Sequence, residues 1–168
     1  MFQKAEKKGL YARIAVIGPS GSGKTMWSLK IAAALSNKRV GVIDTEHRSA
    51  SKYADKFDFD VAEFIDSYSP QLYLKAISDA RDHYDVLVID SLTHAWSGQD
   101  GLLEQVDNIA RRSKSRSSFH AWREVTPIHN KLVESMLSFP GHLIVTMRSK
   151  TEYVQEKDDK GKTQIRKV

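Results

Sequence analysis

The stretch "GPSGSGKT" at residues 18–25 constrains the fold of this chain more than any other segment. It fits the pattern G-x-x-x-x-G-K-[S/T], and it lies between an apolar, strand-like run and a segment of helical period that starts "KTMWSLKIAAAL". Glycines let such a loop bring its backbone N–H groups against phosphate oxygens, and the N-terminus of the following helix adds partial positive charge. The pattern therefore predicts a strand, a phosphate-binding loop and a helix in direct succession.

The loop also predicts which side chains contact a bound nucleotide. Lys24 is expected to reach the β and γ phosphates of ATP, and the Thr25 hydroxyl to ligate Mg²⁺. The predicted nucleotide contacts are Gly18, Pro19, Ser20, Gly21, Ser22, Gly23, Lys24, Thr25 and Met26. The alternative is a Gly-rich turn without function, and both flanking elements argue against it.

Strand-like and helix-like segments alternate along the chain, which predicts an α/β fold of three layers with helices on both faces of a mostly parallel sheet. The predicted strands are residues 11–18, 39–44, 60–65, 85–90 and 142–147, and the predicted helices are residues 24–36, 48–57, 70–83, 100–113 and 127–138. Pro70 and Pro127 suit first helical positions after the caps Ser69 and Thr126. Residues 149–168 predict a polar C-terminal β-hairpin. We expect one domain over residues 1–168, with its core at residues 11–148.

Composition narrows the class of protein further. The 168 residues include no cysteine, which excludes disulfide scaffolds, cysteine nucleophiles and thiolate metal sites. No apolar run approaches the ~18 residues that cross a membrane, and the charged start lacks a secretory signal. A soluble, cytoplasmic protein without membrane contact is therefore expected. The 26 Lys and Arg residues exceed the 21 Asp and Glu residues, and the resulting net charge of +5 is compatible with nucleic-acid binding.

Two acidic residues complete the predicted site. Asp90 in "YDVLVIDS" lies at the carboxyl end of an apolar strand and is the predicted metal-side carboxylate, with a strand cap as the alternative. Ser91 rather than a glutamate follows it, so the general base must come from elsewhere. In "RVGVIDTEHRS", Asp44 and Glu46 lie at the same edge of the sheet, and Glu46 is the predicted base that orients and deprotonates water. The alternative for Glu46 is a solvated loop acid or a helix cap.

Four features together resemble a known family. The stretch "GVIDTEHRSASKYAD", after a phosphate loop and helix, resembles the RecA/RadA/DnaB class. The stretches "DSLTHAW" and "IVTMRSKTEYV", with the spacing of Trp122, His129 and Leu132, are similar to a short phage branch of that class, the RecA-like recombination ATPases linked to single-strand annealing. The resemblance covers most of residues 11–168 and implies the RecA-like core of a P-loop NTPase.

The resemblance implies an ATP- and Mg²⁺-dependent hydrolase that acts on single-stranded DNA as a homo-oligomeric ring or filament, with a single-strand binding protein as a further partner. It implies that Lys24 and Thr25 bind phosphate and metal, that Asp90 supports Mg²⁺ and that Glu46 is the catalytic base. Arg148 would sense the γ phosphate, at a position where the RecA class usually carries a polar amide. Members of the branch tend to continue with further strands, which implies subunit-interface residues beyond residue 168.

The same resemblance assigns the DNA path to the loops after the Walker B strand and after the last core strand, here residues 91–122 and 149–162. The predicted DNA contacts are Arg111, Arg112, Lys114, Arg116 and Lys150. Phe119 and Trp122 beside the first four cations are expected to stack on bases. The alternative is a solvated helix end, in which the cations only favour the helix C-terminus.

Two other classes of protein share the phosphate loop. A guanylate-kinase-like phosphotransferase should soon show an Arg/Tyr-rich nucleotide-monophosphate lobe, and "RVGVIDTEH" follows instead. A regulatory or partition ATPase that does not act on DNA stays open as an alternative, since the ATP core is shared and function resides in the loops. His94 is interpreted as a residue at the edge of the sheet, with a contact to substrate or the γ phosphate as the alternative.

Overall fold

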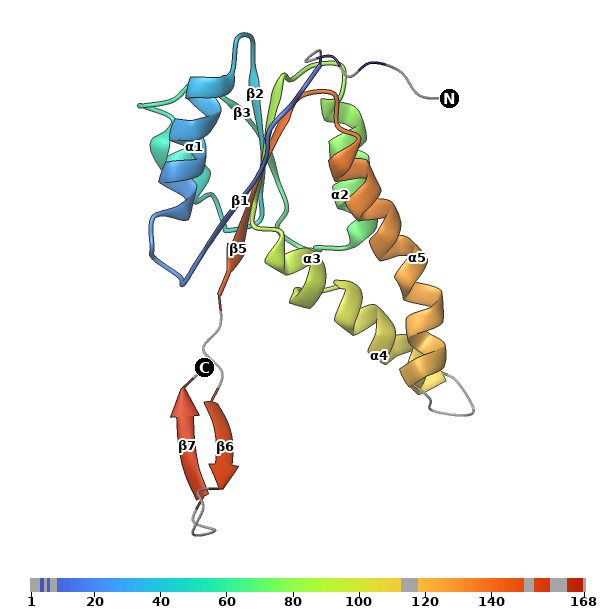
Figure 1. Cartoon of the computed structure of the whole chain (residues 1–168). Coiled ribbons are helices and arrows are strands. Elements are labelled where there is room, and N and C mark those ends of the chain that lie inside the picture. Colours follow the sequence, from blue (N-terminus) through green and yellow to red (C-terminus); the bar gives the residue numbers. More distant parts are fainter. Residues whose placement is uncertain are drawn as a thin grey trace.

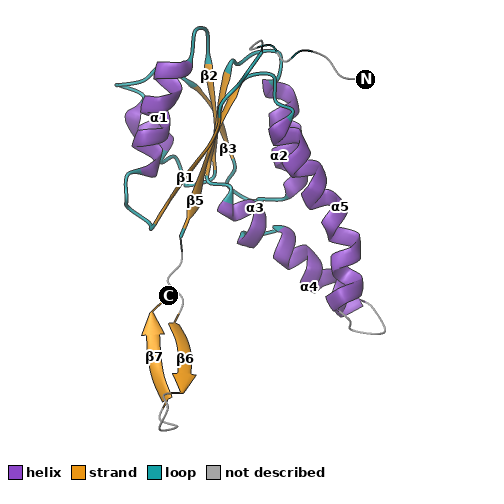
Figure 2. Cartoon of the chain, in the orientation of Figure 1, coloured by secondary structure: helices purple, strands orange, loops and turns teal. Residues whose placement is uncertain are grey.

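The computed structural model describes residues 4, 6, 9–112 and 118–149, together with the backbone of two strands at residues 153–157 and 163–167. A five-stranded sheet lies at its centre, with the strand order β1-β5-β4-β2-β3 and with parallel neighbours throughout. The strands are β1 (Arg13–Gly18), β2 (Val40–Asp44), β3 (Asp60–Glu63), β4 (Val86–Asp90) and β5 (His142–Arg148). Helices cover both faces of this sheet (Figure 1, Figure 2), which confirms the predicted three-layer fold of a P-loop NTPase.

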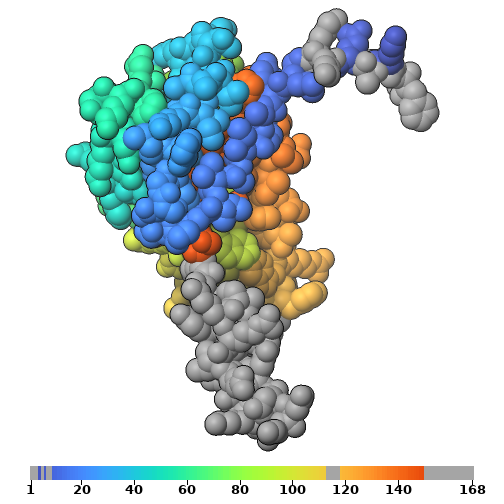
Figure 3. All heavy atoms as spheres, turned by 60° about the vertical axis from the view of Figure 1, so that its left-hand side comes forward, coloured from blue at the N-terminus to red at the C-terminus, as the bar shows by residue number. Residues whose placement is uncertain are grey.

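The two central strands β2 and β4 are buried at every residue, as strands covered on both faces should be. Helix α1 (Lys24–Leu35) and the 3-10 helix η1 (Ala50–Tyr53) cover one face. Helices α2 (Pro70–Ala80) and α5 (Ser118–Leu137) cover the other (Figure 1). In the space-filling view of Figure 3, the blue residues of β1 and α1 face the viewer, and orange residues of α5 lie to their right.

The register of the sheet brings four strand ends to one edge. Gly18 pairs with Arg148 across β1 and β5, and Asp44 pairs with Asp90 across β2 and β4. Because parallel strands end on the same side, the loops that follow them share that edge, where ligands of open α/β sheets bind. The fold therefore brings together segments that are far apart in the sequence.

Helices α3 (Thr93–Ser97) and α4 (Leu102–Arg112) lead from the end of β4 to the start of α5 (Figure 1). The sequence did not predict α3. Leu102 and Val106 of α4 pack against Ala121 and Val125 of α5 in a small apolar cluster of their own. This packing extends α5 toward its N-terminus by a further two turns.

Two predicted helices are therefore wrong in their bounds. The helix expected at residues 127–138 begins at Ser118, and Pro127 lies inside it rather than at its first position. Packing of Ala121 and Val125 holds the turn before Pro127 in helical form, although this proline has no N–H to donate. The helix expected at residues 48–57 is only the short η1, because His47 and Arg48 adopt positive φ values of 50° and 64°.

The C-terminal residues form the predicted antiparallel pair of strands. Strands β6 (Tyr153–Lys157) and β7 (Thr163–Lys167) make a separate two-stranded sheet, and the expected turn at residues 158–162 lies outside the described residues. Over the part of the chain that the structure describes, no helix is both long and apolar enough to cross a membrane.

Candidate active site

A cavity of about 190 Å³ lies at the carboxyl edge of the sheet, between the loops that follow β1, β2, β4 and β5. Its lining residues are Ser20, Gly21, Gly23, Lys24, Thr25, Glu46, Ser49, Tyr53, Asp90 and Arg148. The structure thus brings the phosphate loop, the predicted base, the predicted metal-side acid and Arg148 together in one cavity.

The phosphate loop has the conformation that its glycines allow. Gly21 and Gly23 adopt φ values of 77° and 81°, in the left-handed region that L side chains rarely occupy. Lys24 is 9% exposed, and its Nζ donates a hydrogen bond of 2.7 Å to the carbonyl oxygen of Pro19 within the same loop. The ammonium group therefore already lies in the loop, where a phosphate oxygen could replace the carbonyl as its partner.

Asp90 is 2% exposed and uses both carboxylate oxygens. Its Oδ2 accepts a 2.6 Å hydrogen bond from the Thr25 hydroxyl, and its Oδ1 accepts one of 2.5 Å from the Thr146 hydroxyl. The Thr25 Oγ1 also lies 3.5 Å from the Ser49 Oγ. The buried Asp90 carboxylate thus contacts the Thr25 hydroxyl of the phosphate loop directly. A metal ion bound to the nucleotide phosphates needs these two oxygen groups side by side.

These oxygen donors fit Mg²⁺. Among the described residues, no group of three or more His, Cys, Asp or Glu side chains could hold a metal ion by itself. Mg²⁺ rarely uses such a cage and is usually bound by one or two protein oxygens together with phosphates and water. Thr25 and Asp90 would supply those oxygens, and bound Mg²⁺ would neutralise negative charge on the phosphates.

Asp44 shapes the loop that carries Glu46. Its carboxylate is buried and accepts hydrogen bonds from the backbone N–H of Glu46 at 2.7 Å and of Ala50 at 2.9 Å. Burial raises the pKa of Asp44 above its usual value, although the two N–H groups act in the opposite direction. Asp44 therefore fixes the turn between β2 and η1, and Glu46 lines the cavity from this turn.

Arg148 is paired with Glu46 across the cavity. Its Nε donates to Glu46 Oε1 at 2.8 Å and its Nη2 donates to Glu46 Oε2, so the ion pair is bidentate. The hydrogen bonds to Glu46 raise the pKa of Arg148 further above its usual value. The two residues are 102 positions apart in the sequence, and only the parallel register of the sheet brings them together.

A family model described as an AAA domain matches residues 10–167, a span that includes the phosphate loop and all five strands of the sheet. The chain belongs to the AAA domain family. The AAA domain is a nucleotide-binding, nucleotide-hydrolysing P-loop unit. A search of curated proteins found none with significant similarity.

A buried polar network lies behind the cavity of this AAA domain. Thr45 accepts a 2.8 Å hydrogen bond from the Ser91 backbone N–H, and its Oγ1 lies 2.7 Å from His94 Nδ1. His94 packs against the Tyr68 ring, and burial lowers the pKa of its imidazole. These contacts support the interpretation of His94 as a residue at the sheet edge. The Asp90–Ser91 peptide bond is cis.

Three residues of the site were not among the predicted site residues. Tyr53 and Ser49 line the cavity from η1 and the loop before it, and Thr146 contacts Asp90 from the neighbouring strand. Thr146 could have been found from strand alignment, since it follows Val145, the partner of Ile89. Tyr53 and Ser49 had no comparable signal, because the path of their loop depends on Asp44.

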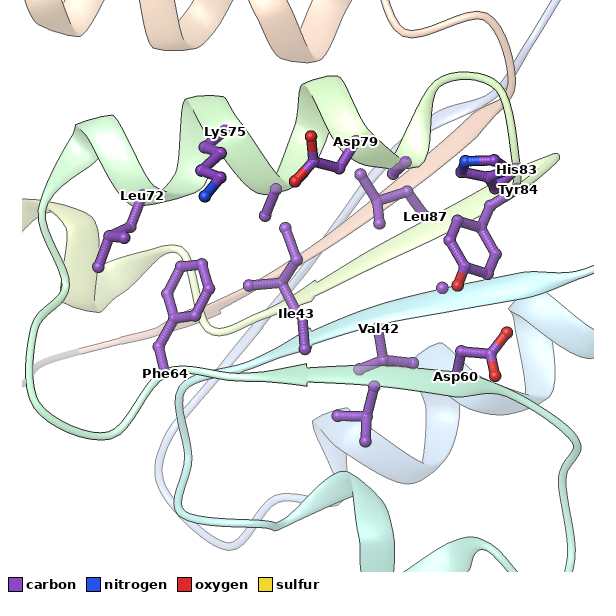
Figure 4. Close-up of a pocket in the computed structure, with 15 residues that line it drawn as sticks. Val42, Ile43, Asp60, Phe64, Leu72, Lys75, Asp79, His83, Tyr84 and Leu87 are labelled. Atoms are coloured by element: carbon purple, nitrogen blue, oxygen red, sulfur yellow. The ribbon is translucent and has the colours of Figure 1, made fainter.

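A larger cavity, of about 430 Å³, lies between α2 and the strands β2 and β3. Figure 4 shows side chains of the helix and of the strands facing each other across it, with Phe64 at one end and Tyr84 at the other. Its lining is largely apolar and includes no residue of the phosphate loop. The smaller cavity, with Lys24 and Arg148, is therefore the site that suits phosphates.

Two of the predicted DNA contacts, Arg111 and Arg112, lie among the described residues and do not line the nucleotide cavity of the AAA domain. Arg111 and Arg112 are exposed in the last turn of α4, and Arg111 Nη2 donates to Asn108 Oδ1 at 2.9 Å. Nearby, Phe119 is 82% exposed and Trp122 stacks on Trp96 of α3, with ring centroids 5.7 Å apart. The remaining predicted contacts lie outside the described residues: Lys114, Arg116 and Lys150.

Proposed function

We propose that this AAA domain protein is a RecA-like ATPase that hydrolyses ATP with Mg²⁺ and acts on single-stranded DNA in phage-type recombination or annealing. The observation that carries the hydrolytic part is the meeting of Lys24, Thr25, Asp90 and Glu46 in one cavity. In this proposal Lys24 binds phosphate, Thr25 and Asp90 bind the metal, and Glu46 is the base. A neighbouring residue holds each of these side chains by a hydrogen bond.

In this proposal the phosphate loop and Lys24 hold the β and γ phosphates. Glu46 accepts a proton from a water molecule as the water oxygen bonds to the γ phosphorus. The bond between the γ phosphorus and the bridging oxygen breaks, and ADP and inorganic phosphate leave. Arg148, in the same cavity, is the proposed sensor of the γ phosphate.

The DNA part rests on other features. The exposed cations Arg111 and Arg112 stand near exposed Phe119 and the stacked rings of Trp96 and Trp122, and cations beside aromatic rings suit single-stranded nucleic acid. The resemblance to RecA-like proteins supports the same partner and a homo-oligomeric ring or filament. It also supports a single-strand binding protein as an accessory partner.

The deciding experiment measures steady-state ATP hydrolysis at fixed salt with and without single-stranded DNA. We expect turnover to rise with the DNA concentration and to saturate, and Lys24→Ala to abolish turnover under both conditions. Double-stranded DNA of equal length is the comparison. Hydrolysis that is indifferent to DNA would instead support the regulatory or partition ATPase, which shares the same core.

A further inference from the structure

Glu46, the residue that the proposed function assigns to water activation, forms an ion pair with Arg148. Both oxygens of the Glu46 carboxylate accept hydrogen bonds from the guanidinium, one from Nε at 2.8 Å and one from Nη2. A carboxylate paired in this way has its lone pairs directed at a cation rather than at water. In the nucleotide-free protein, Glu46 is therefore not ready to accept a proton.

The backbone on both sides of this pair is fixed. The Arg148 N–H donates to Thr93 Oγ1 at 2.9 Å, and the N–H of the next residue, Ser149, donates to the Gly18 carbonyl at 3.1 Å. The Glu46 N–H is held by Asp44. Separation of the pair therefore needs only rotation of two side chains, which are 38% and 17% exposed.

Arg148 lines the same cavity as Lys24, so a terminal phosphate held by Lys24 would compete with Glu46 for the guanidinium. Guanidinium groups bind phosphate and carboxylate with the same two-pronged geometry. A diphosphate leaves the γ position empty and offers no such competitor.

We propose that the pair is a latch that keeps Glu46 away from water until a nucleoside triphosphate is bound. The γ phosphate draws Arg148 away from Glu46, and the released carboxylate then activates water. This inference rests on the proposed ATPase function and adds to it the residue pair that makes release of the base depend on the γ phosphate. Glu46 therefore lowers the affinity for the triphosphate, because it competes for Arg148, and it promotes hydrolysis once it is released.

The test is a set of dissociation constants for ADP and for a non-hydrolysable ATP analogue, both with Mg²⁺, measured by calorimetry. Because Glu46→Gln frees Arg148, the analogue should bind about 3- to 10-fold more tightly, the range expected for breaking a partly exposed ion pair. Arg148→Gln should weaken analogue binding about 10-fold. Binding of ADP should change by less than about 2-fold in both variants, because neither side chain needs a diphosphate partner.

The double variant Glu46→Gln/Arg148→Gln separates a latch from simple charge repulsion. If Glu46 acts through Arg148, the double variant should bind the analogue as Arg148→Gln does, with no further gain. If the gain from Glu46→Gln persists without Arg148, Glu46 only repels the phosphate and the latch is overturned. A Glu46→Gln protein that binds ADP normally and the analogue no more tightly also overturns it.

The ion pair of Arg48 with Glu63, at 2.9 Å, provides the matched control because neither residue lines the nucleotide cavity. Arg48→Gln and Glu63→Gln make the same charge changes near the same edge of the sheet and should leave both dissociation constants unchanged. Failure of the underlying function would look different, since wild-type protein would then bind neither nucleotide, or Lys24→Ala would bind both as well as wild type.

Discussion

Asp90 and Glu46 are two carboxylates of one cavity, and their surroundings differ. Asp90 is buried and hydrogen-bonded by two threonine hydroxyls, which hold its oxygens in place. Glu46 is partly exposed and has the partly exposed guanidinium of Arg148 as its partner. A fixed carboxylate suits a metal, whereas a carboxylate that can exchange partners suits proton transfer.

Glu46→Gln should slow hydrolysis at least ~10²-fold, because general-base catalysis typically contributes 10²–10⁴. The amide cannot accept the water proton, but nucleotide binding should persist because the phosphate loop is intact. Single-turnover hydrolysis at saturating Mg²⁺ and ATP measures the chemical step. Turnover close to that of wild type would move the base to another residue.

Asp90→Asn should act on the metal instead. The amide keeps the size of the side chain but removes the negative charge beside Thr25, so the Mg²⁺ concentration needed for half-maximal activity should rise and turnover should fall. A Mg²⁺ titration of ATP hydrolysis measures this shift. An unchanged Mg²⁺ dependence would leave Asp90 with the role of a strand cap.

At the scale of single residues, a local sequence pattern was enough to predict some of the side chains that line the cavity. Lys24 and Thr25 follow from the phosphate loop, and Asp90 and Glu46 follow from strands that end in acids. The pairing of Glu46 with Arg148 could not be predicted in this way. It depends on the positions of β2 and β5 in the sheet and on the turn that Asp44 holds.

The C-terminus of α5 is attached to the sheet by one side chain of β1. Arg13 Nη1 donates to the Gly141 carbonyl at 2.6 Å, and Nη2 donates to the carbonyls of Leu137 at 2.9 Å and Phe139 at 2.5 Å. Cations that bind the last carbonyls of a helix satisfy acceptors that have no intrahelical donor. Arg13 thereby connects an edge strand to the helix that covers it.

Arg13→Met should lower the free energy of unfolding by about 2–4 kcal/mol, because several carbonyls lose a charged donor at once. Chemical denaturation monitored by circular dichroism measures the loss. Arg48→Met is the control and should lose less than about 1 kcal/mol, as expected for an exposed ion pair. Equal losses in the two variants would contradict the role given to Arg13.

Asp85 holds the connection between α1 and β2. Its carboxylate accepts hydrogen bonds from the Ser36 hydroxyl at 2.8 Å and from the N–H groups of Asn37 at 2.7 Å and Arg39 at 3.0 Å. Partial burial raises the pKa of Asp85, but these hydrogen bonds outweigh it and hold the pKa below its usual value. The charged form is therefore the one that stabilises the fold.

The pKa of Asp85 is lower in the folded state than in the unfolded state, so its charged form stabilises the fold. This stabilisation is fully present at pH values above the unfolded-state pKa of about 3.9, and it is lost as the pH falls through the lower folded-state pKa. Asp85→Asn should thus lower the free energy of unfolding by about 1–3 kcal/mol near neutral pH, and the difference from wild type should shrink in acid. Urea denaturation over a pH series measures it. Asp55→Asn, on an exposed residue, is the control and should change the free energy of unfolding near neutral pH by less than about 0.5 kcal/mol.

At the scale of elements, the strands were predictable, whereas two predicted helices were wrong in their bounds and α3 was not predicted. Apolar runs such as residues 86–89 identify buried strands by themselves. The start of α5 depends on its contacts with α4, and those contacts outweigh the local signal of Pro127. The expected helix after β2 failed for the opposite reason, since Asp44 and two residues at positive φ impose a turn.

At the scale of the whole molecule, the nucleotide cavity and the proposed DNA surface are different parts of the chain. Removal of the four cations Arg111, Arg112, Lys114 and Arg116 by alanine substitution should weaken binding of all single-stranded sequences alike. The slope of log affinity against log salt should flatten by about 0.7 for each phosphate that the variant no longer neutralises. ATP hydrolysis without DNA should persist, because the phosphate loop is unchanged and the two described cations, Arg111 and Arg112, do not line the nucleotide cavity.

Fluorescence anisotropy with labelled oligonucleotides over a salt series measures this slope. A control variant with the same loss of charge replaces four exposed lysines on other surfaces, Lys30, Lys38, Lys56 and Lys75. An unchanged slope in the first variant, or the same flattening in both, would remove the α4–α5 surface from the DNA path and favour the C-terminal hairpin.

The hydrogen bond from the Ser149 N–H to the Gly18 carbonyl has a mechanical consequence. It joins the point where the chain leaves the sheet to the first residue of the phosphate loop. Tension applied to the chain after Ser149 would therefore reach the phosphate loop directly. A nucleotide that stiffens the loop would, in the same way, restrict the direction in which that segment departs.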